Sequence, residues 1–329
     1  MGKLRTAVVG VGRFGRFHAE KYARLEGSEL VAVADVDRAR AEEVAGKYGV
    51  SPVFDFRDLF GRVDVVSIAV PTALHYEVAK PFLENGVHVL VEKPITDDLA
   101  KADELIQLAK DKGVTLQVGH VERFSAVRLG VEEIIDDPVF IECNRLMPFR
   151  PGSVDIDVIL DLMIHDIDLI LDIVRAPVIK VDAVGTPVLT SGVDIANARI
   201  EFETGCIANI TASRVSTKDE RKIRIFQRRA YISIDFLHNK VTIANSGNAK
   251  PFQGVSGIAV DERSYEEGDK LEREIEAFLQ AVARGTTPPV TGEDSRRALQ
   301  TVFLINRSLR SRSGLGGGKT SAPRRRGGG

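Results

Sequence analysis

Three glycines near the start of the chain constrain the fold more than any other feature. Gly10, Gly12 and Gly15 follow the apolar run RTAVVG in the spacing G-x-G-x-x-G, and the helical pattern RFHAEKYARL comes directly after them. In a strand–turn–helix unit the first glycine permits the tight turn, the second lets backbone amides approach a pyrophosphate, and the third lets the helix pack close to the strand. The N-terminus of such a helix favours an anion. The motif therefore predicts a dinucleotide-binding site.

A carboxylate stands at the spacing that such a site requires. Asp35 ends the next apolar run, ELVAVAD, about 20 residues beyond Gly15, where it can accept hydrogen bonds from a ribose 2′-OH and repel a 2′-phosphate. This spacing favours NAD over NADP as the cofactor. Arg13 and Arg38 lie close enough in sequence to tolerate a 2′-phosphate, and Phe14, inside the glycine loop, is a further expected cofactor contact.

The pattern of apolar runs predicts the fold class. From residue 5 to about 118, β-branched runs that are apolar on both faces alternate with helical segments, which is typical of a doubly wound (Rossmann) parallel sheet. Past about residue 136 the strand-like segments are longer, and ANARIEFETG and CIANITASRV alternate with a period of two about a Thr-Gly turn. We therefore expect an α/β domain followed by an α+β domain with a large, mostly antiparallel open sheet.

The same pattern suggests domain boundaries. We expect an NAD-binding domain over residues 1–120 and a domain for substrate binding and oligomerisation over 121–312, whose last helices pack back on the first domain. Residues 313–329 are rich in glycine and arginine and almost free of apolar side chains, so they are expected to form a disordered tail.

Composition narrows the classes of partner. Basic and acidic residues nearly balance, 45 against 47, which argues against a nucleic-acid partner because such proteins usually concentrate positive charge on one face. No run approaches the length of a membrane span, and the start lacks the pattern of a signal peptide, so we expect a cytoplasmic protein with no membrane partner. Cys143 and Cys206 stand alone in strand-like segments, which predicts reduced thiols and no metal site.

Polar residues follow two of the predicted parallel strands. The run VDVVSIAV leads into Pro71, Thr72 and His75, and the run VHVLV leads into Glu92 and Lys93. Because the carboxyl ends of the strands line the ligand crevice of a doubly wound sheet, these residues are candidates for cofactor contact. Pro71 and Thr72 could equally do no more than start a helix, and Glu92 and Lys93 could simply mark the end of a strand.

A predicted helix over roughly 155 to 174 carries the other candidates. At 100° per residue, five polar residues fall within one stripe of about 80°, and nearly everything else around the helix is Ile, Leu, Val or Met. A solvated stripe is the simpler interpretation, but no Lys or Arg occurs from 151 to 174, and like charges one turn apart are destabilising. Asp161 and Asp168 would hold the ring of His165 and favour its charged form, and an imidazole so oriented is a plausible base for an alcohol. The stripe consists of Asp157, Asp161, His165, Asp168 and Asp172.

Taken together, the glycine motif with Asp35, P-T-x-x-H at 71–75, E-K-P at 92–94 and D-x-x-x-H at 161–165 resemble the glucose–fructose oxidoreductase/inositol dehydrogenase (Gfo/Idh/MocA) family, from about residue 4 to 312. The resemblance implies an NAD(P)-dependent oxidoreductase acting on the CH–OH group of a sugar or polyol. Lys93 would lie between nicotinamide and substrate and polarise the reacting oxygen, Asp161 and His165 would reach in from the second domain with His165 as base, and Glu92 would contact ribose or nicotinamide. The family also implies homodimers or homotetramers joined through the second sheet.

Within that family, GHVERF at 119–124 and VILDLMIHDIDLIL are most similar to bacterial UDP-N-acetylglucosamine 3-dehydrogenases. This resemblance implies oxidation at C3 of a nucleotide sugar, giving a 3-keto sugar for amino-sugar and lipid A biosynthesis. Arg123 and Arg214 would pair with the diphosphate and Asp168 would be a further substrate contact, although a salt bridge within the protein is an equal alternative for each arginine. A dehydrogenase of a free sugar or inositol, and a non-catalytic NAD-binding regulatory protein, are the alternative functions.

Overall fold

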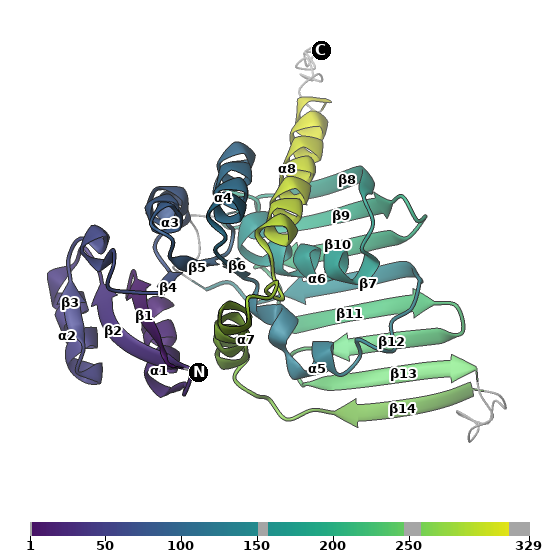
Figure 1. Ribbon diagram of the computed structural model, residues 1–329. Helices are drawn as coiled ribbons and strands as arrows, with labels where there is room; N and C mark the ends of the chain where they lie inside the picture. The colour runs from purple at the N-terminus through teal and green to yellow at the C-terminus, as the bar shows by residue number, and fades with distance from the viewer. Residues whose placement is uncertain (1, 151–156, 247–257, 316–329) are drawn as a thin grey trace, which may run out of the picture.

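The computed structural model describes residues 2–150, 157–246 and 258–315, and in them the chain forms two sheets joined by helices (Figure 1). The first sheet has six strands, all parallel, in the order β3-β2-β1-β4-β5-β6. Helices α1 (Gly15–Arg24), α2 (Arg38–Tyr48), α3 (His75–Glu84) and α4 (Leu99–Lys112) connect its strands. The strands are β1 (Leu4–Val9), β2 (Ser28–Ala34), β3 (Ser51–Val53), β4 (Val65–Ile68), β5 (His88–Glu92) and β6 (Leu116–Gly119).

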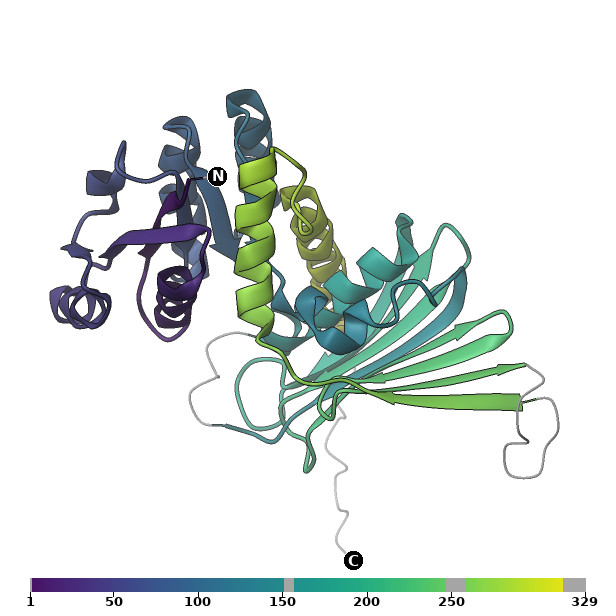
Figure 2. The same cartoon turned by 60° about the horizontal axis from the view of Figure 1, so that its bottom comes forward.

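The second sheet has eight strands in the order β14-β13-β12-β11-β7-β10-β9-β8. Its neighbours pair antiparallel except for β7 and β10, which are parallel. Helices cover one face of this sheet, and no described helix lies on the opposite face (Figure 2). The strands are β7 (Pro138–Leu146), β8 (Val178–Thr186), β9 (Ile195–Phe202), β10 (Ile207–Ser213), β11 (Glu220–Gln227), β12 (Ala230–Asp235), β13 (Lys240–Ser246) and β14 (Ile258–Ser264).

These two sheets confirm the predicted fold class. The short edge strand β3 was not among the apolar runs, because its three residues include a proline and two of them are exposed. Aspartate side chains cap the starts of two helices: Asp37 accepts a hydrogen bond from the amide of Arg40 at the start of α2, and Asp98 accepts one from the amide of Ala100 at the start of α4.

The apolar helix expected over roughly 155 to 174 is not one regular helix. Residues Ile159–Met163 form a π-helical turn, and α6 (Ile164–Val174) comes after it. The side chain of Asp157 accepts hydrogen bonds from the amides of Ile159 and Leu160, so it caps the start of this segment. A π turn holds an extra residue and rotates the next turns of the helix about its axis, so residues before and after it do not share one straight stripe.

The last two helices connect the two sheets. Helix α7 (Lys270–Arg284) packs against α1, and α8 (Gly292–Leu315) packs against α4 and β6 on one side and against α6 and β8 on the other (Figure 1). Because α8 reaches Leu315, the chain is still helical past residue 313, where the tail was expected to begin. Residues 316–329 lie outside the described part, and the boundaries at 120 and 312 remain predictions. Across the described residues no helix has the length and apolar character of a bilayer span.

Candidate active site

The glycine loop is folded tightly against the end of β4. Gly10 has φ +83°, and a Cβ added to it would lie 2.8 Å from Val70 and 2.9 Å from the backbone of Ala69. A Cβ added to Gly15 would lie 1.8 Å from the carbonyl oxygen of Gly10, so neither position accepts a side chain. A Cβ at Gly12, in contrast, would meet nothing within 4 Å. The loop therefore leaves its middle open, which fits the close approach of a pyrophosphate.

Asp35 lies beside this loop and is held by backbone amides. Its carboxylate accepts hydrogen bonds from the amide of Val11 at 2.9 Å and from the amide of Asp37 at 2.9 Å. Arg40 reaches the same carboxylate at 3.3 Å, whereas the guanidinium of Arg38 lies over the ring of Phe54, 4.2 Å from its centroid. The arginine that accompanies Asp35 is thus Arg40, which was not among the residues expected from the sequence.

A pocket of about 600 Å³ opens at this place. Of the predicted cofactor residues, Gly12 and Arg13 line it, while the ring of Phe14 is 61% exposed next to the guanidinium of Arg13. Its other lining residues are Arg16, Phe17 and Arg40. The sequence did carry a signal for these three residues. Arg16 and Phe17 follow the glycine motif on the first turn of α1, and Arg40 follows Asp35 on the first turn of α2.

Lys93, at the end of β5, meets the second half of the molecule. Its ammonium group donates a hydrogen bond to the backbone carbonyl of Asp161 at 3.1 Å. Burial lowers the pKa of Lys93, against the opposing effect of the Asp161 and Glu92 carboxylates. The peptide bond between Lys93 and Pro94 is cis. The structure thus brings Lys93 and Asp161 together through the backbone of Asp161.

A chain of buried hydrogen bonds holds Glu92. One carboxylate oxygen lies 3.0 Å from Nε2 of His18, and the other accepts the amide hydrogen of Lys93 at 3.2 Å. His18 Nδ1 lies 3.1 Å from the hydroxyl of Ser67, which lies 2.8 Å from the hydroxyl of Tyr22. Burial alone would raise the pKa of Glu92, but the bond from His18 and the charge of Lys93 hold that pKa below its usual value. Because a carboxylate only accepts, Nε2 must carry a hydrogen. In the neutral ring Nδ1 then accepts from the hydroxyl of Ser67, which accepts from that of Tyr22.

His75 braces the loop on the other side of Lys93. Its Nδ1 lies 2.8 Å from the carbonyl oxygen of Pro94, its Nε2 lies 3.0 Å from that of Val70, and burial lowers the pKa of its imidazole. Pro71 and Thr72 begin the short 3-10 turn that leads into α3. His75 therefore supports the backbone around Pro94 and Val70. The positions of Pro71 and Thr72 match the alternative that they start a helix.

His165 lies one turn beyond Asp161 and is partly buried. Within the described residues its Nδ1 has no hydrogen-bond partner. Burial, together with the positive charges of Lys93 and Arg145, lowers the pKa of His165 well below its usual value. The expectation that Asp161 and Asp168 favour the charged form of this ring is therefore wrong, because nearby cations and burial dominate. The unprotonated ring is the form that can accept a proton.

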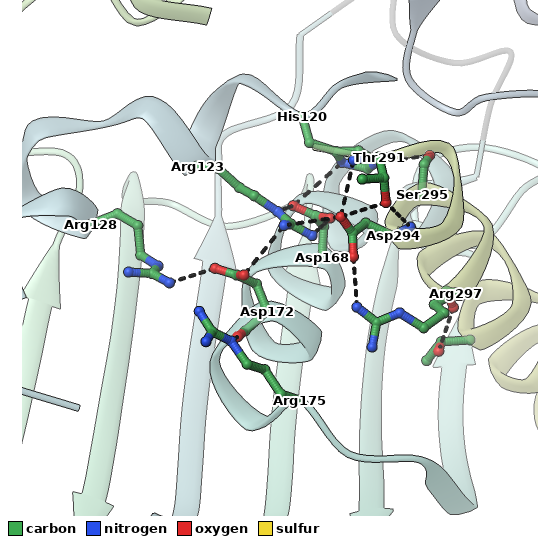
Figure 3. A network of polar contacts seen from close by, with 11 residues as sticks. His120, Arg123, Arg128, Asp168, Asp172, Arg175, Thr291, Asp294, Ser295 and Arg297 are labelled. Atoms are coloured by element: carbon green, nitrogen blue, oxygen red, sulfur yellow. Dashed lines mark hydrogen bonds and ion pairs between the residues drawn. The ribbon is translucent and has the colours of Figure 1, made fainter. Parts of the chain in front are cut away.

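Asp168 is instead part of a buried network of ion pairs (Figure 3). Arg123 donates to both of its carboxylate oxygens, at 2.6 and 2.7 Å, and also reaches Asp172 at 3.3 Å. Arg128 donates to Asp172 as well, and His120 Nδ1 lies 3.7 Å from Asp168. For Arg123 the structure thus has the salt bridge that the sequence left open as an alternative to a diphosphate contact, and Asp168 is its partner.

Arg214, the other arginine expected at the diphosphate, is also buried. Its Nε lies 3.7 Å from the carboxylate of Asp194, a residue that is itself fully buried. The same carboxylate accepts hydrogen bonds from the amides of Val188, Leu189 and Thr190. This position again matches the salt-bridge alternative.

A further buried arginine, next to His165, was not expected from the sequence. Arg145 on β7 forms two hydrogen bonds with Asp166, both 2.8 Å long, and reaches Glu122 at 3.5 Å. A signal was present: Ile141, Cys143 and Arg145 alternate on the inward face of the strand, and a charged residue at such a position requires a partner. No three potential metal-ligating side chains come together in the ranges that the structure describes.

Two family models match parts of the chain. A family model described as "Oxidoreductase family, NAD-binding Rossmann fold" (GFO_IDH_MocA) matches residues 4–120, and the GFO/IDH/MocA C-terminal domain model matches residues 148–233. The chain is 40% identical over 303 residues to UDP-N-acetylglucosamine 3-dehydrogenase of Acidithiobacillus ferrooxidans, covering 92% of this chain and 96% of that protein. It is 27% identical over 332 residues to scyllo-inositol 2-dehydrogenase (NAD(+)) of Bacillus subtilis, covering 94% and 95%.

Solved structures of dehydrogenases also resemble this chain. The UDP-N-acetylglucosamine 3-dehydrogenase of Acidithiobacillus ferrooxidans superposes with a TM-score of 0.90 at 38% identity, covering 94% of this chain and 99% of that one. A levoglucosan dehydrogenase solved with NADH and levoglucosan superposes with a TM-score of 0.84 at 18% identity, covering 94% and 98%. The second likeness concerns the fold alone.

Proposed function

The chain belongs to the Gfo/Idh/MocA family of oxidoreductases, and we propose that it oxidises the C3 hydroxyl of UDP-N-acetylglucosamine or a closely related nucleotide sugar. The relative at 40% identity over 92% of the chain supports this substrate class, and the inositol dehydrogenase at 27% is more distant. One observation carries the reaction site: Lys93, beside the dinucleotide loop, reaches Asp161 one turn before His165. A cation and a proton acceptor from the two halves of the molecule therefore meet at one place.

NAD is the proposed cofactor. The open Gly12 position and the pocket beside it fit a dinucleotide, and Gly10, Gly12, Arg13 and Asp35 would hold it. Asp35 supports NAD over NADP, since its carboxylate would repel a 2′-phosphate. When bound, the nicotinamide accepts the hydride that leaves the substrate carbon.

The chain's own residues would handle the proton and the oxygen. Oxidation of a secondary alcohol to a ketone releases a hydride from carbon and a proton from oxygen. The ammonium of Lys93 would hold the reacting oxygen by a charge-assisted hydrogen bond. The ring of His165, whose pKa is held low by burial and by nearby cations, would accept the proton. Asp161 would set the position of Lys93 through its carbonyl oxygen.

The experiment is a comparison of substrates with one purified protein. NADH formation is followed with UDP-N-acetylglucosamine, N-acetylglucosamine, myo-inositol and scyllo-inositol, each with NAD and with NADP. We expect turnover with the nucleotide sugar and NAD. Turnover only with an inositol or a free sugar would replace the proposed substrate. NAD binding without turnover on any of them would favour the regulatory alternative. Association into dimers or tetramers through the open face of the second sheet remains a prediction.

A further inference from the structure

Two arginines face each other across neighbouring strands of the second sheet. Arg221 on β11 pairs in register with Arg145 on β7. Ile223 and Ile225, two and four residues further along β11, are buried in the helix-covered core, so Arg221 belongs to the same face. Like charges directly opposite one another are destabilising in a sheet, so this pair requires compensating negative charge.

The carboxylates near Arg145 and Arg221 compensate the positive charge of this pair only in part. Asp166 is engaged by both arms of the Arg145 guanidinium. Glu122 is then shared: it lies 3.0 Å from Lys270, 3.5 Å from Arg145 and 4.0 Å from Arg221. Within the described parts of the chain, three cations thus face two carboxylates, which leaves an excess positive charge. Among the described residues the 4.0 Å contact with Glu122 is the only ion pair that Arg221 makes, and its side chain is 41% exposed.

This excess charge lies at the proposed reaction site. Arg145 and Arg221 both contribute to the low pKa of His165, and Asp166 is the next residue of the chain. Arg145 itself is buried and fully engaged, and Arg123 is held by Asp168 and Asp172. Of these arginines near His165 in the described parts of the chain, Arg221 is therefore the accessible and weakly paired one.

We propose that Arg221, with Lys270 beside it, binds the diphosphate of the substrate, an inference that rests on the proposed function. The planar guanidinium matches phosphate oxygens with two parallel hydrogen bonds, and an ammonium adds a point charge. A diphosphate at this place would supply the negative charge that Glu122 alone does not. It would also fix the sugar relative to Lys93 and His165, so that a sugar without a diphosphate binds poorly.

The test compares Arg221→Ala with Arg62→Ala. Arg62 is exposed and precedes β4, at the amino ends of the strands of the first sheet, where it donates to the carbonyl of Asp58 at 3.4 Å, so its variant removes the same charge away from the site. We expect Arg221→Ala to lower kcat/KM for UDP-N-acetylglucosamine roughly 10- to 100-fold, with an unchanged Kd for NAD. Arg62→Ala should behave as wild type, and Arg221→Lys should retain part of the lost activity because it keeps the charge.

Calorimetric titration with UDP, in the presence of NAD, separates this inference from the proposed reaction. We expect UDP to bind the wild type and to bind Arg221→Ala at least 10-fold more weakly. UDP binding that depends on Arg221, without oxidation of UDP-N-acetylglucosamine, would preserve the subsite and overturn only the proposed reaction. Equal UDP binding by the wild type and by a correctly folded Arg221→Ala protein, or no UDP binding by the wild type, would overturn the subsite.

Discussion

The ammonium of Lys93 donates a hydrogen bond to the backbone carbonyl of Asp161 at 3.1 Å, although 68 positions separate the two residues in sequence. Lys93 directly follows β5 of the first sheet, and Asp161 lies in the π-helical turn over the second. The proposed reaction site is therefore assembled between the two sheets. Its chemistry depends on their relative position as much as on the residues themselves.

Replacing Lys93 by alanine should reduce kcat roughly 100- to 10,000-fold, because the reacting oxygen loses its charged hydrogen-bond donor. The Kd for NAD should change little, since the glycine loop and Asp35 are untouched. NADH formation and a titration with NAD measure the two quantities. Lys112→Ala, which removes an exposed lysine at the end of α4, serves as control. A fully active Lys93→Ala enzyme would remove Lys93 from the mechanism.

The low pKa of His165 predicts the acid side of the pH profile. Burial first, and then the charges of Lys93 and Arg145, disfavour the protonated ring, so the base stays unprotonated below the usual histidine pKa of about 6.5. Activity should thus persist as the pH falls through that value and be lost only at lower pH. In Lys93→Met a cation is missing, so the acid limb of the residual activity should move to higher pH. A limb that stays in place would show that another group titrates.

His18 should act as a positioning residue for Glu92 and Lys93. His18→Ala leaves Glu92 without its donor, and we expect kcat to fall by up to about 100-fold as the Lys93 backbone shifts. His18→Gln keeps an N–H group near the position of Nε2 and should recover much of that loss. Steady-state kinetics below the melting temperature of each variant provide the comparison. Failure of glutamine to recover more activity than alanine would count against the hydrogen bond as the cause.

Asp35→Ala should relax the preference against NADP. The variant removes the charge that would repel a 2′-phosphate, and it releases Arg40, which lies 3.3 Å from that carboxylate and could then pair with the phosphate. The ratio of kcat/KM for NAD to that for NADP measures the effect. Asp35→Asn, which removes the charge but keeps the shape, should shift the ratio in the same direction. An unchanged ratio in both variants would refute the assignment of Asp35 to the ribose.

Arg123→Ala should be costly to stability. It leaves Asp168, which is 1% exposed, as an unpaired buried charge, so the free energy of unfolding should drop by about 3–5 kcal/mol. Urea denaturation measures the loss, and the double variant Arg123→Ala with Asp168→Asn should recover part of it. If Arg123→Ala instead keeps its stability and loses affinity for the nucleotide sugar, then the diphosphate role expected from the sequence is correct.

The features of the fold and site that could be predicted depend on residues close together in sequence. The glycine spacing, Asp35 and the strand that ends in Glu92 and Lys93 are local signals, since turn and strand geometry place them without reference to the rest of the chain. His18 could not be recognised in this way, because its role depends on Ser67 and Glu92, which belong to other strands.

The second half shows the same limit. The polar stripe was calculated for a regular helix, and the π turn at Ile159–Met163 changed its register, while Asp166 lay outside the stripe. Arg145 and Arg221 are far apart in sequence, and only the pairing of β7 with β11 brings them together beside His165. Pairing between distant segments, rather than any single motif, determined which charges surround the proposed base.

Helices α7 and α8 complete the hydrophobic core on the first sheet. Ile275, Phe278 and Leu279 pack with Val8 and other residues of the first sheet, and Val290 and Leu299 join a second cluster on it. During synthesis at roughly 5–20 residues per second, those apolar surfaces would await their partners for on the order of ten seconds after β6 has formed. Until α7 and α8 have been synthesised, the apolar surface of the first sheet that they cover stays exposed in the nascent chain, and exposed apolar surface of this kind favours aggregation.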